Sequence, residues 1–501
     1  MSKFKRILIV ALVSIFFSSF LFASMRFMFS FSPSVLYDNS PTFFSSTEST
    51  WAKEDSLDKP IEDYWEKTQD SIRRFDNRLP LLSGGFEIEN DNILFAIKLN
   101  IKEELYNFLS YSPKSNVPYI GNTKYAITNA QYPTVAFLNY KNSLLELSIG
   151  RRLFHMGPGE YSFILSPVQP YLDHFFSSLC YRKETFSLIY DFYALSSSNS
   201  TFTPGERTSV YKTFFIHKAT YERKGLIIAL SELNCVYDAI PTLADFTPFV
   251  LWHNQYQEEH SNVMIELSFE TKIKDIRLYG LYAQDDICLK NESDNLKPTA
   301  LGFALGLDWQ IKKGNRYLAP STKDSDYIRH EKNLKDEGGL HLAFESYFAT
   351  NWLYNRRDQS PEGTCTSDKY GKITLPYRFY SSNGGYTDKI DAYYLGFPFG
   401  PGSIYFNLKL SSEEMYHKLS FSFSTLFRGD IDIDTKIEKG SKDKWLELQG
   451  DIRSVYFITL EADKVLEKIS PSLALSFSLT LSMTNEYYFT TQGRLSFIYG
   501  I

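Results

Sequence analysis

The chain has 501 residues, a formal net charge of −6 and many aromatic residues, with 41 Phe and 35 Tyr. The negative charge disfavours nucleic acid as a partner, because nucleic-acid binding depends on clustered Lys and Arg. Four cysteines lie far apart without a CxxC pair, so neither a zinc site nor a disulfide framework is predicted, and no cofactor or metal is expected. They are Cys180, Cys235, Cys288 and Cys365.

Residues 1–23 have the features of a secretory signal peptide. Lys3, Lys5 and Arg6 precede an apolar run that ends in small residues. Loss of these three cations changes the formal charge from −6 to −9. An uncleaved membrane anchor is the alternative, since apolar residues continue beyond Arg26. No cysteine directly follows the apolar run, so lipid attachment is not predicted there.

Residues 24–80 are predicted to be a periplasmic lead-in with one amphipathic helix. Asp58 is a suitable N-cap and Pro60 suits the first helical turn. The apolar side of this helix must pack on the periplasmic mouth of a barrel, on the outside of the fold or on a partner; it contains Ile61, Tyr64, Trp65, Ile72 and Phe75. Residues 30–50 are rich in Ser, Thr and Pro, which favours a flexible segment.

Residues 81–501 show the alternation of a transmembrane β-barrel. Between Leu473 and Leu481, apolar residues alternate strictly with Ala, Ser and Thr, which suits a wall with lipid outside and a polar lumen. The pattern recurs in residues 93–101, 263–269, 301–311, 404–410, 419–426 and 495–501. The predicted fold is all-β: a large antiparallel barrel of about 16–18 strands in the bacterial outer membrane. A secreted soluble β-protein with an aromatic core is the alternative.

Three polar segments are predicted to be extracellular loops, and one of them can fold inward and plug the lumen. They are residues 285–298, 317–338 and 355–391. The last carries Arg356, Arg357 and Arg378, which makes it a candidate for binding anionic sugars or phosphates. Solvated surface charge is the simpler interpretation of the same residues.

The segment that begins at Gly150 combines two adjacent arginines with a turn motif. Arg151 and Arg152 point in opposite directions on a strand, so one faces the lumen and the other faces lipid or its interface. Candidate carboxylate partners are Glu146, Asp173, Asp285 and Asp286. Two Gly-Pro-Gly sequences predict sharp turns at strand ends or in an inward-folded loop; they are Gly157-Pro158-Gly159 and Gly400-Pro401-Gly402. Arg151, Arg152, His155 and Asp173 are the candidate ligand contacts here, and structural ion pairing is the alternative.

Four blocks resemble the Wzi-type capsule assembly family of outer-membrane barrels, with Met156 standing where that family has tryptophan. They are residues 150–182, 212–232, 278–286 and 393–402, in family order. The resemblance implies a barrel of roughly eighteen strands, within the even-numbered range of such proteins, blocked by loops and a helical element. It also implies a lectin-like function, the binding of surface polysaccharide and its tethering to the outer membrane.

The expected partners are outer-membrane lipid, surface polysaccharide and the barrel assembly machinery, and the protein is expected to be a monomer. A porin or specific transport channel is the main alternative function, because it shares the alternation and the polar lumen. Catalysis is not expected, since the two His pairs worth naming match no nucleophile motif. These pairs are His155 with Ser166 and His174 with Asp173.

Overall fold

The computed structural model describes most of the region after residue 80 and a short stretch before it. The described residues are 24–38, 81–101, 103–107, 113–115, 123–129, 133–167, 172–196, 212–237, 239–247, 261–286, 298–317, 328–329, 338–354, 373–381, 385–431, 446–484 and 489–500.

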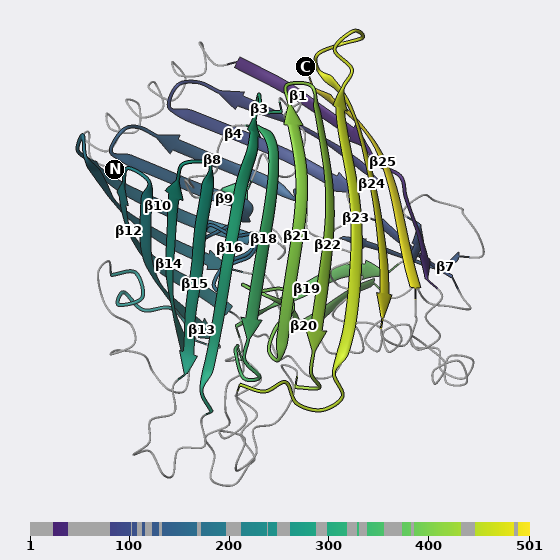
Figure 1. The fold of residues 1–501 in the computed structure, drawn as a ribbon. Helices are drawn as coiled ribbons and strands as arrows, with labels where there is room; N and C mark the ends of the chain where they lie inside the picture. Colours follow the sequence, from purple (N-terminus) through teal and green to yellow (C-terminus); the bar gives the residue numbers. More distant parts are fainter. Residues whose placement is uncertain are drawn as a thin grey trace.

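Eighteen antiparallel strands pair in a closed ring, which confirms the predicted barrel (Figure 1). In ring order they are β1 (Ser24–Phe31), β3 (Leu82–Glu89), β4 (Ile93–Ile101), β8 (Val135–Lys141), β9 (Leu145–Phe154), β10 (Leu172–Arg182), β11 (Phe186–Ser196), β12 (Lys212–Arg223), β13 (Leu226–Tyr237), β14 (Ser261–Ile273), β15 (Ile276–Asp286), β16 (Ala300–Lys313), β18 (Gly339–Ala349), β21 (Ser403–Glu414), β22 (His417–Arg428), β23 (Arg453–Val465), β24 (Leu473–Thr484) and β25 (Phe489–Gly500). The ring closes where β25 pairs with β1.

Seven further strands extend the wall or belong to its connections. They are β2 (Ser34–Asp38), β5 (Glu103–Asn107), β6 (Pro113–Ser115), β7 (Thr123–Asn129), β17 (Ile328–Arg329), β19 (Thr374–Ser381) and β20 (Gly385–Tyr394). β2 continues the pairing of β1 along β25. The hairpin of β19 and β20 lies in the connection from β18 to β21 and pairs with β7. β17 pairs in parallel with the last two residues of β9.

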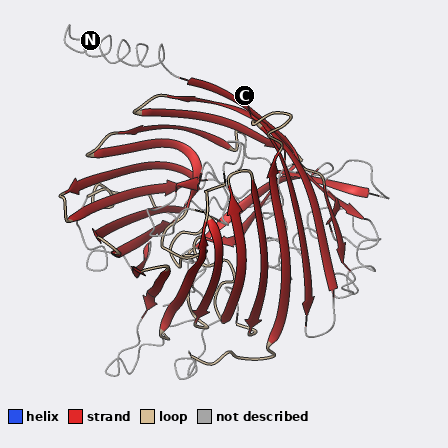
Figure 2. Ribbon diagram, turned by 45° about the horizontal axis from the view of Figure 1, so that its top comes forward, coloured by secondary structure: helices blue, strands red, loops and turns tan. Residues whose placement is uncertain are grey.

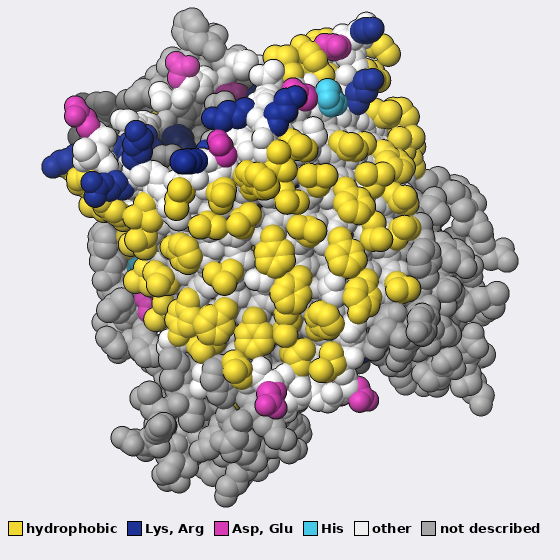
Figure 3. Space-filling model, viewed as in Figure 1, with side chains coloured by type: hydrophobic (Ala, Val, Ile, Leu, Met, Phe, Trp, Pro, Cys, Tyr) yellow, Lys and Arg dark blue, Asp and Glu magenta, His cyan; other side chains and the backbone are white. Residues whose placement is uncertain are grey.

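The outer surface of the wall is apolar because alternate residues of each strand point outward. On β16, Leu305 is 62% exposed while its neighbours Ala304 and Gly306 face inward. Figure 3 shows the resulting broad hydrophobic band, with Lys and Arg gathered at one end of the barrel. This band is the surface that the outer-membrane lipid covers.

The two ends of the barrel differ in the length of their connections. At one end β12 and β13 are joined by residues 224–225, and β14 and β15 by residues 274–275. β1 begins and β25 ends at this same end (Figure 1). Short turns of outer-membrane barrels face the periplasm, so this is the periplasmic end. Strands β16 and β18 are also joined at this end, where Lys313 pairs with Gly339, which disagrees with the prediction that residues 317–338 form an extracellular loop. Within this connection, β17 pairs with the far end of β9.

The start of the barrel also differs from the expectation. Ser24–Phe31, which we expected in a lead-in, is barrel strand β1 and pairs with both β3 and β25. Its alternation of exposed Phe27 and Phe29 with buried Met28 and Ser30 is that of the other strands, so the signal was present in the sequence. The helix predicted after Asp58 lies outside the described residues. No helix in the described ranges is long and apolar enough to cross a membrane.

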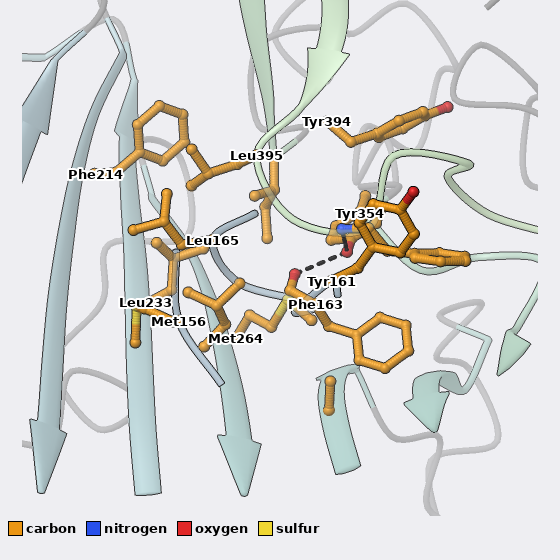
Figure 4. Packing of buried hydrophobic residues seen from close by; sticks show 14 of the residues in the cluster. Met156, Tyr161, Phe163, Leu165, Phe214, Leu233, Met264, Tyr354, Tyr394 and Leu395 are labelled. Carbon is orange, nitrogen blue, oxygen red and sulfur yellow. Dashed lines mark hydrogen bonds between the residues drawn. The ribbon is translucent and has the colours of Figure 1, made fainter. Parts of the chain in front are cut away.

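The hydrophobic core lies inside the ring. It joins inward-facing residues of β9 to β22 to two connections that enter the lumen. Figure 2 shows loop segments inside the ring of strands. Figure 4 labels ten members of this core, which come from both the wall and these connections. One side of the lumen is therefore filled with protein.

Candidate functional site: the inner loops and the lumen wall

The connection from β9 to β10 turns into the lumen. We call residues 155–167 inner loop 1. Two glycines with positive φ allow the change of direction, Gly150 at 131° and Gly157 at 80°. A Cβ on Gly150 would lie 2.1 Å from the carbonyl oxygen of Ala136, so a larger residue does not fit. The first predicted Gly-Pro-Gly turn therefore begins an inward-folded loop.

A carboxylate on the wall holds the middle of inner loop 1. Glu266 on β14 accepts a hydrogen bond of 2.7 Å from the backbone N–H of Phe163. It also accepts one of 3.0 Å from the hydroxyl of Ser162. Phe163 and Ser162 are fully buried, so these bonds satisfy donors that water cannot reach. Glu266 thus fixes the loop against the wall.

A second carboxylate on the wall holds inner loop 1 at Glu160, shortly before the segment held by Glu266. Glu345 on β18 accepts a hydrogen bond of 2.9 Å from the backbone N–H of Glu160 and another from the hydroxyl of Tyr279. The hydroxyl of Tyr347, two residues along β18, accepts one of 3.1 Å from the backbone N–H of Tyr161. Inner loop 1 is therefore attached to two neighbouring regions of the wall.

An arginine on β15 completes these attachments. Arg277 donates from Nη2 to the carbonyl oxygen of Pro158 at 2.5 Å. Its Nε forms an ion pair of 2.5 Å with Glu270 on β14. Both side chains of this pair are buried, so the arginine binds the loop without leaving an unpaired charge.

The connection from β18 to β21 supplies the second inner loop. We call residues 350–354 and 395–402 together inner loop 2. Tyr354, which has a φ of 70°, donates from its hydroxyl to the carbonyl oxygen of Phe163 at 2.8 Å (Figure 4). The same hydroxyl accepts from the backbone N–H of Phe397 at 2.8 Å. Burial raises the pKa of Tyr354 well above its usual value, so the hydroxyl keeps its proton and can donate. Tyr354 thus joins both inner loops.

The second Gly-Pro-Gly sequence lies in inner loop 2. Gly400 has a φ of 71° and Gly402 one of 59°, and Pro401 between them is buried. A Cβ on Gly400 would come within 2.3 Å of the ring of Tyr394. The predicted turn is therefore present, and it lets the chain pass from the lumen back into β21.

One residue of inner loop 1 faces open space. Glu160 is exposed, although the residues on either side of it are buried. Its Oε2 accepts a hydrogen bond of 2.9 Å from the side-chain amide of Asn407, on the inward face of β21. The Oδ1 of Asn407 accepts one of 3.0 Å from Ser424 on β22. A chain of hydrogen bonds therefore links the loop tip to β21 and β22.

The wall from β22 to β24 is lined by small hydroxyl-bearing residues. The inward positions are occupied by Ser420, Ser422, Ser424, Thr459, Ser476, Ser478, Thr480 and Ser482. Thr459 and Thr480 lie opposite each other, with their hydroxyl oxygens 3.2 Å apart, and both are half-buried. Two carboxylates join this surface, since Glu461 accepts from Ser420 and Asp463 from Ser476. We call these inward positions the hydroxyl wall.

The two predicted arginines point to opposite sides of the barrel. Arg151 forms a bidentate ion pair with Asp173, at 2.7 and 2.9 Å. Arg151 is two residues from exposed Ile149 and Asp173 is two residues from exposed Phe175, so all four share the outer face of the barrel. An open pocket of about 550 Å³ lies beside the ion pair. Arg152 faces inward, 4.2 Å above the ring of Phe137.

The other predicted site residues divide into three groups. Asp285 is buried and accepts a hydrogen bond of 2.9 Å from the backbone N–H of Tyr354, while Asp286 ends β15. His155 is half-buried at the start of inner loop 1. Arg356 and Arg357 lie outside the described residues, and Arg378 pairs in register with Asp388 in the β19–β20 hairpin. A role for any of them in ligand binding stays a prediction.

Sequence reasoning missed Glu160, Glu266, Glu345 and Tyr354. A signal for two of them exists, because a carboxylate at an inward position of an alternating strand needs a buried partner. Glu266 lies between the outward residues Ile265 and Leu267, and Glu345 follows the exposed Phe344. Their partners are backbone groups of a loop over 100 residues away in sequence, which no local pattern can identify.

No family model matches the chain, and no curated protein matches it. Solved structures do match over nearly the whole length. Pseudomonas aeruginosa OccK11 (OpdR) is 8% identical, with 95% of this chain and 96% of that chain covered and a TM-score of 0.42. Pseudomonas aeruginosa OpdL is 10% identical, with 96% and 99% covered and a TM-score of 0.42. Acinetobacter baumannii OccAB4 is 8% identical, with 95% and 98% covered and a TM-score of 0.41.

These matches contradict the resemblance to the Wzi-type capsule assembly family. They are OprD/Occ channels, and a surface polysaccharide has no support as a partner. The expectation of a polysaccharide tether is therefore wrong.

Proposed function

We propose that this protein is a selective outer-membrane channel for small polar solutes. The observation that carries the proposal is the exposed carboxylate of Glu160, inside a closed barrel and opposite a wall of hydroxyl groups. A side chain that is exposed at this position has water beside it. The path for a solute runs between inner loop 1 and the hydroxyl wall.

The inner loops make this channel narrow. Inner loop 1 and inner loop 2 share a buried apolar core with the wall from β9 to β22, so solutes are excluded from that side. Glu266, Glu345 and Tyr354 attach the inner loops by hydrogen bonds. These attachments support a constriction that is fixed in place, and they argue against loops that move freely. A fixed constriction selects solutes by size and by contacts with the groups that line it.

The carboxylate of Glu160 favours cations at the tip of inner loop 1. Charges of both signs line the wall beside it: Glu461 and Asp463 face inward on β23, as do Lys409 on β21 and Lys418 on β22, and Lys418 is paired with Glu413 at 2.7 Å. Glu160 is therefore the charge to which we assign ion preference, because Asp and Glu in narrow pores favour cations. The hydroxyl groups add hydrogen-bonding partners for polar solutes.

The experiment is conductance of the purified, folded protein in planar lipid bilayers. We expect discrete channels whose reversal potential in a KCl gradient indicates preference for K⁺ over Cl⁻. Glu160→Gln should reduce that preference, whereas Glu184→Gln, an exposed residue in the short turn between β10 and β11, should leave it unchanged. Folded protein that inserts but conducts no ions would contradict the proposed function.

A further inference from the structure

Residues 239–247, in the connection from β13 to β14, pack against the outside of the barrel. We call these residues the strap. The ring of Phe246 lies 4.9 Å from that of Phe215 and 6.5 Å from that of Phe192, both outward-facing residues of the wall. Asp245 accepts a hydrogen bond of 3.3 Å from the side chain of Asn234 on β13. The strap therefore packs on the face of the wall that elsewhere contacts lipid.

The register of the strands places the strap beside the lipid-facing band. Directly paired residues form a row across the outer wall: Ile149, Phe175, Ala194, Phe215, Asn234 and Val263. Ile149 and Phe175, at one end of this row, are exposed to lipid. Phe215 and Asn234, further along it, are buried. The lipid-facing band is therefore continuous, across neighbouring strands, with the area on which the strap packs.

The wall beneath the strap carries polar residues whose exposure to lipid would be energetically unfavourable. His217 and Glu232 lie directly opposite each other on β12 and β13, at outward positions, and each is 7% exposed. Tyr190 on β11 hydrogen-bonds to His217. Charged or polar side chains on the lipid face of a barrel destabilise it, so this patch needs a protein cover. Phe192, which the strap contacts, packs edge-on against His217 at 5.4 Å.

The far side of the strap is apolar and uncovered. Ile240 is 90% exposed and Leu243 is 88% exposed. The second half of the strap forms internal backbone hydrogen bonds: the N–H groups of Asp245, Phe246 and Thr247 each donate to the carbonyl oxygen three residues earlier. Asp245 also accepts hydrogen bonds from the N–H and hydroxyl of Thr242. These bonds reduce the number of backbone groups that the strap would present to hydrocarbon without a partner.

We propose that the strap shields the polar patch of the outer wall and is itself inserted in the membrane, with Ile240 and Leu243 in contact with lipid acyl chains. Continuity with the lipid-facing band selects acyl chains as the occupant, because exposed residues of that band lie in the same row. The strap thereby replaces one strip of barrel wall as the lipid-contacting surface. This assignment does not depend on what passes through the lumen.

Fluorescence quenching by brominated phosphatidylcholine tests the proposal. Ile240→Trp and Leu243→Trp are made separately, and each refolded protein is compared in liposomes with and without brominated acyl chains. Leu230→Trp, at an exposed position of the lipid-facing band, is the positive control. Ile469→Trp is the negative control: Ile469 is 75% exposed, about as much as the two strap residues, but lies in the periplasmic turn between β23 and β24. The signal of the six native Trp residues is subtracted as measured in the unchanged protein.

We expect both strap variants to be quenched to the same degree as Leu230→Trp and Ile469→Trp to be unaffected. The proposal is wrong if the strap variants are quenched no more than Ile469→Trp. In that case water or a second copy of the chain covers the strap. Retained heat-modifiable migration on a gel establishes that each variant is folded. Two positions are used so that a folding defect at one leaves the other as the test.

Discussion

The two sides of the lumen follow the same strand pattern but are filled in different ways. Inward positions from β12 to β18 carry large or charged residues, such as Glu266, Arg277 and Tyr347, and these attach the inner loops. Inward positions from β22 to β24 include eight Ser and Thr residues of the hydroxyl wall, together with a few larger residues such as Leu426 and Phe457 that pack on the core. Strand alternation therefore sets only which face is lipid-exposed, while the size of the inward residues decides whether that side holds a plug or a path.

The largest expected effect comes from releasing the plug. Glu266→Ala removes the acceptor of two buried donors, and a hydrogen bond to a charged group contributes about 1.5–3 kcal/mol. We expect inner loop 1 to leave the wall and single-channel conductance to rise several-fold. Ser268→Ala, at the next inward position of β14, is the matched control. Equal conductance of the two variants would mean that inner loop 1 does not limit the path.

Separating the inner loops should have the next largest effect. Tyr354→Phe leaves the carbonyl of Phe163 and the N–H of Phe397 without this partner, at a cost of about 1–3 kcal/mol for each buried group. The temperature at which the folded form is lost on a gel should fall, and conductance should become noisier. Tyr282→Phe removes a hydroxyl outside the lumen that bonds Gln284 at 3.1 Å, and should change neither property.

A smaller change is expected from the hydroxyl wall. Thr480→Val keeps the shape of the side chain but removes a half-exposed hydroxyl from the path. We expect conductance to fall by about a factor of two, because an ion or polar solute loses one hydrogen-bonding partner. Leu479→Val, at the adjacent outward position, tests whether the same strand tolerates a change on its lipid side. A fall in both variants would indicate a general effect on β24.

The smallest effect should come from the ion pair on the outer face. Arg151→Ala removes a partly exposed pair with Asp173, and such pairs contribute about 0.2–1 kcal/mol. Conductance and ion preference should stay unchanged, because the pair lies outside the lumen. A changed reversal potential for Arg151→Ala would show that charges on the outer face also act on the path.

The sequence predicted the wall well and the lumen poorly, for one physical reason. Alternation is a local property, so the runs at residues 93–101, 301–311 and 473–481 were identified as strands and their outward faces were assigned correctly. The strand at Ser24–Phe31 shows the same alternation. It was hidden because it directly follows the apolar run of the expected signal peptide, which made its apolar residues look like a continuation of that run.

The blocks that suggested the Wzi-type family have a structural explanation here. Residues 150–166 form the end of β9 and inner loop 1, and residues 393–402 lead through inner loop 2. The remaining blocks, at 212–232 and 278–286, provide wall strands on which the loops pack. The motifs therefore mark how the lumen is plugged, and plugging alone does not identify a ligand. The contacts that attach the plug join distant segments, so no spacing in the sequence predicts them.

The pairing of β1 with β25 determines when this molecule can finish folding. Met28 is paired with Gly500, so the ring stays open until the last strand has been made and delivered to the membrane. Such distant pairing gives a high contact order, which slows folding and prolongs the exposure of unpaired strand edges. A partly translated or truncated chain therefore presents two open edges at the seam, and closure rather than strand formation is expected to be the slowest step in its biogenesis.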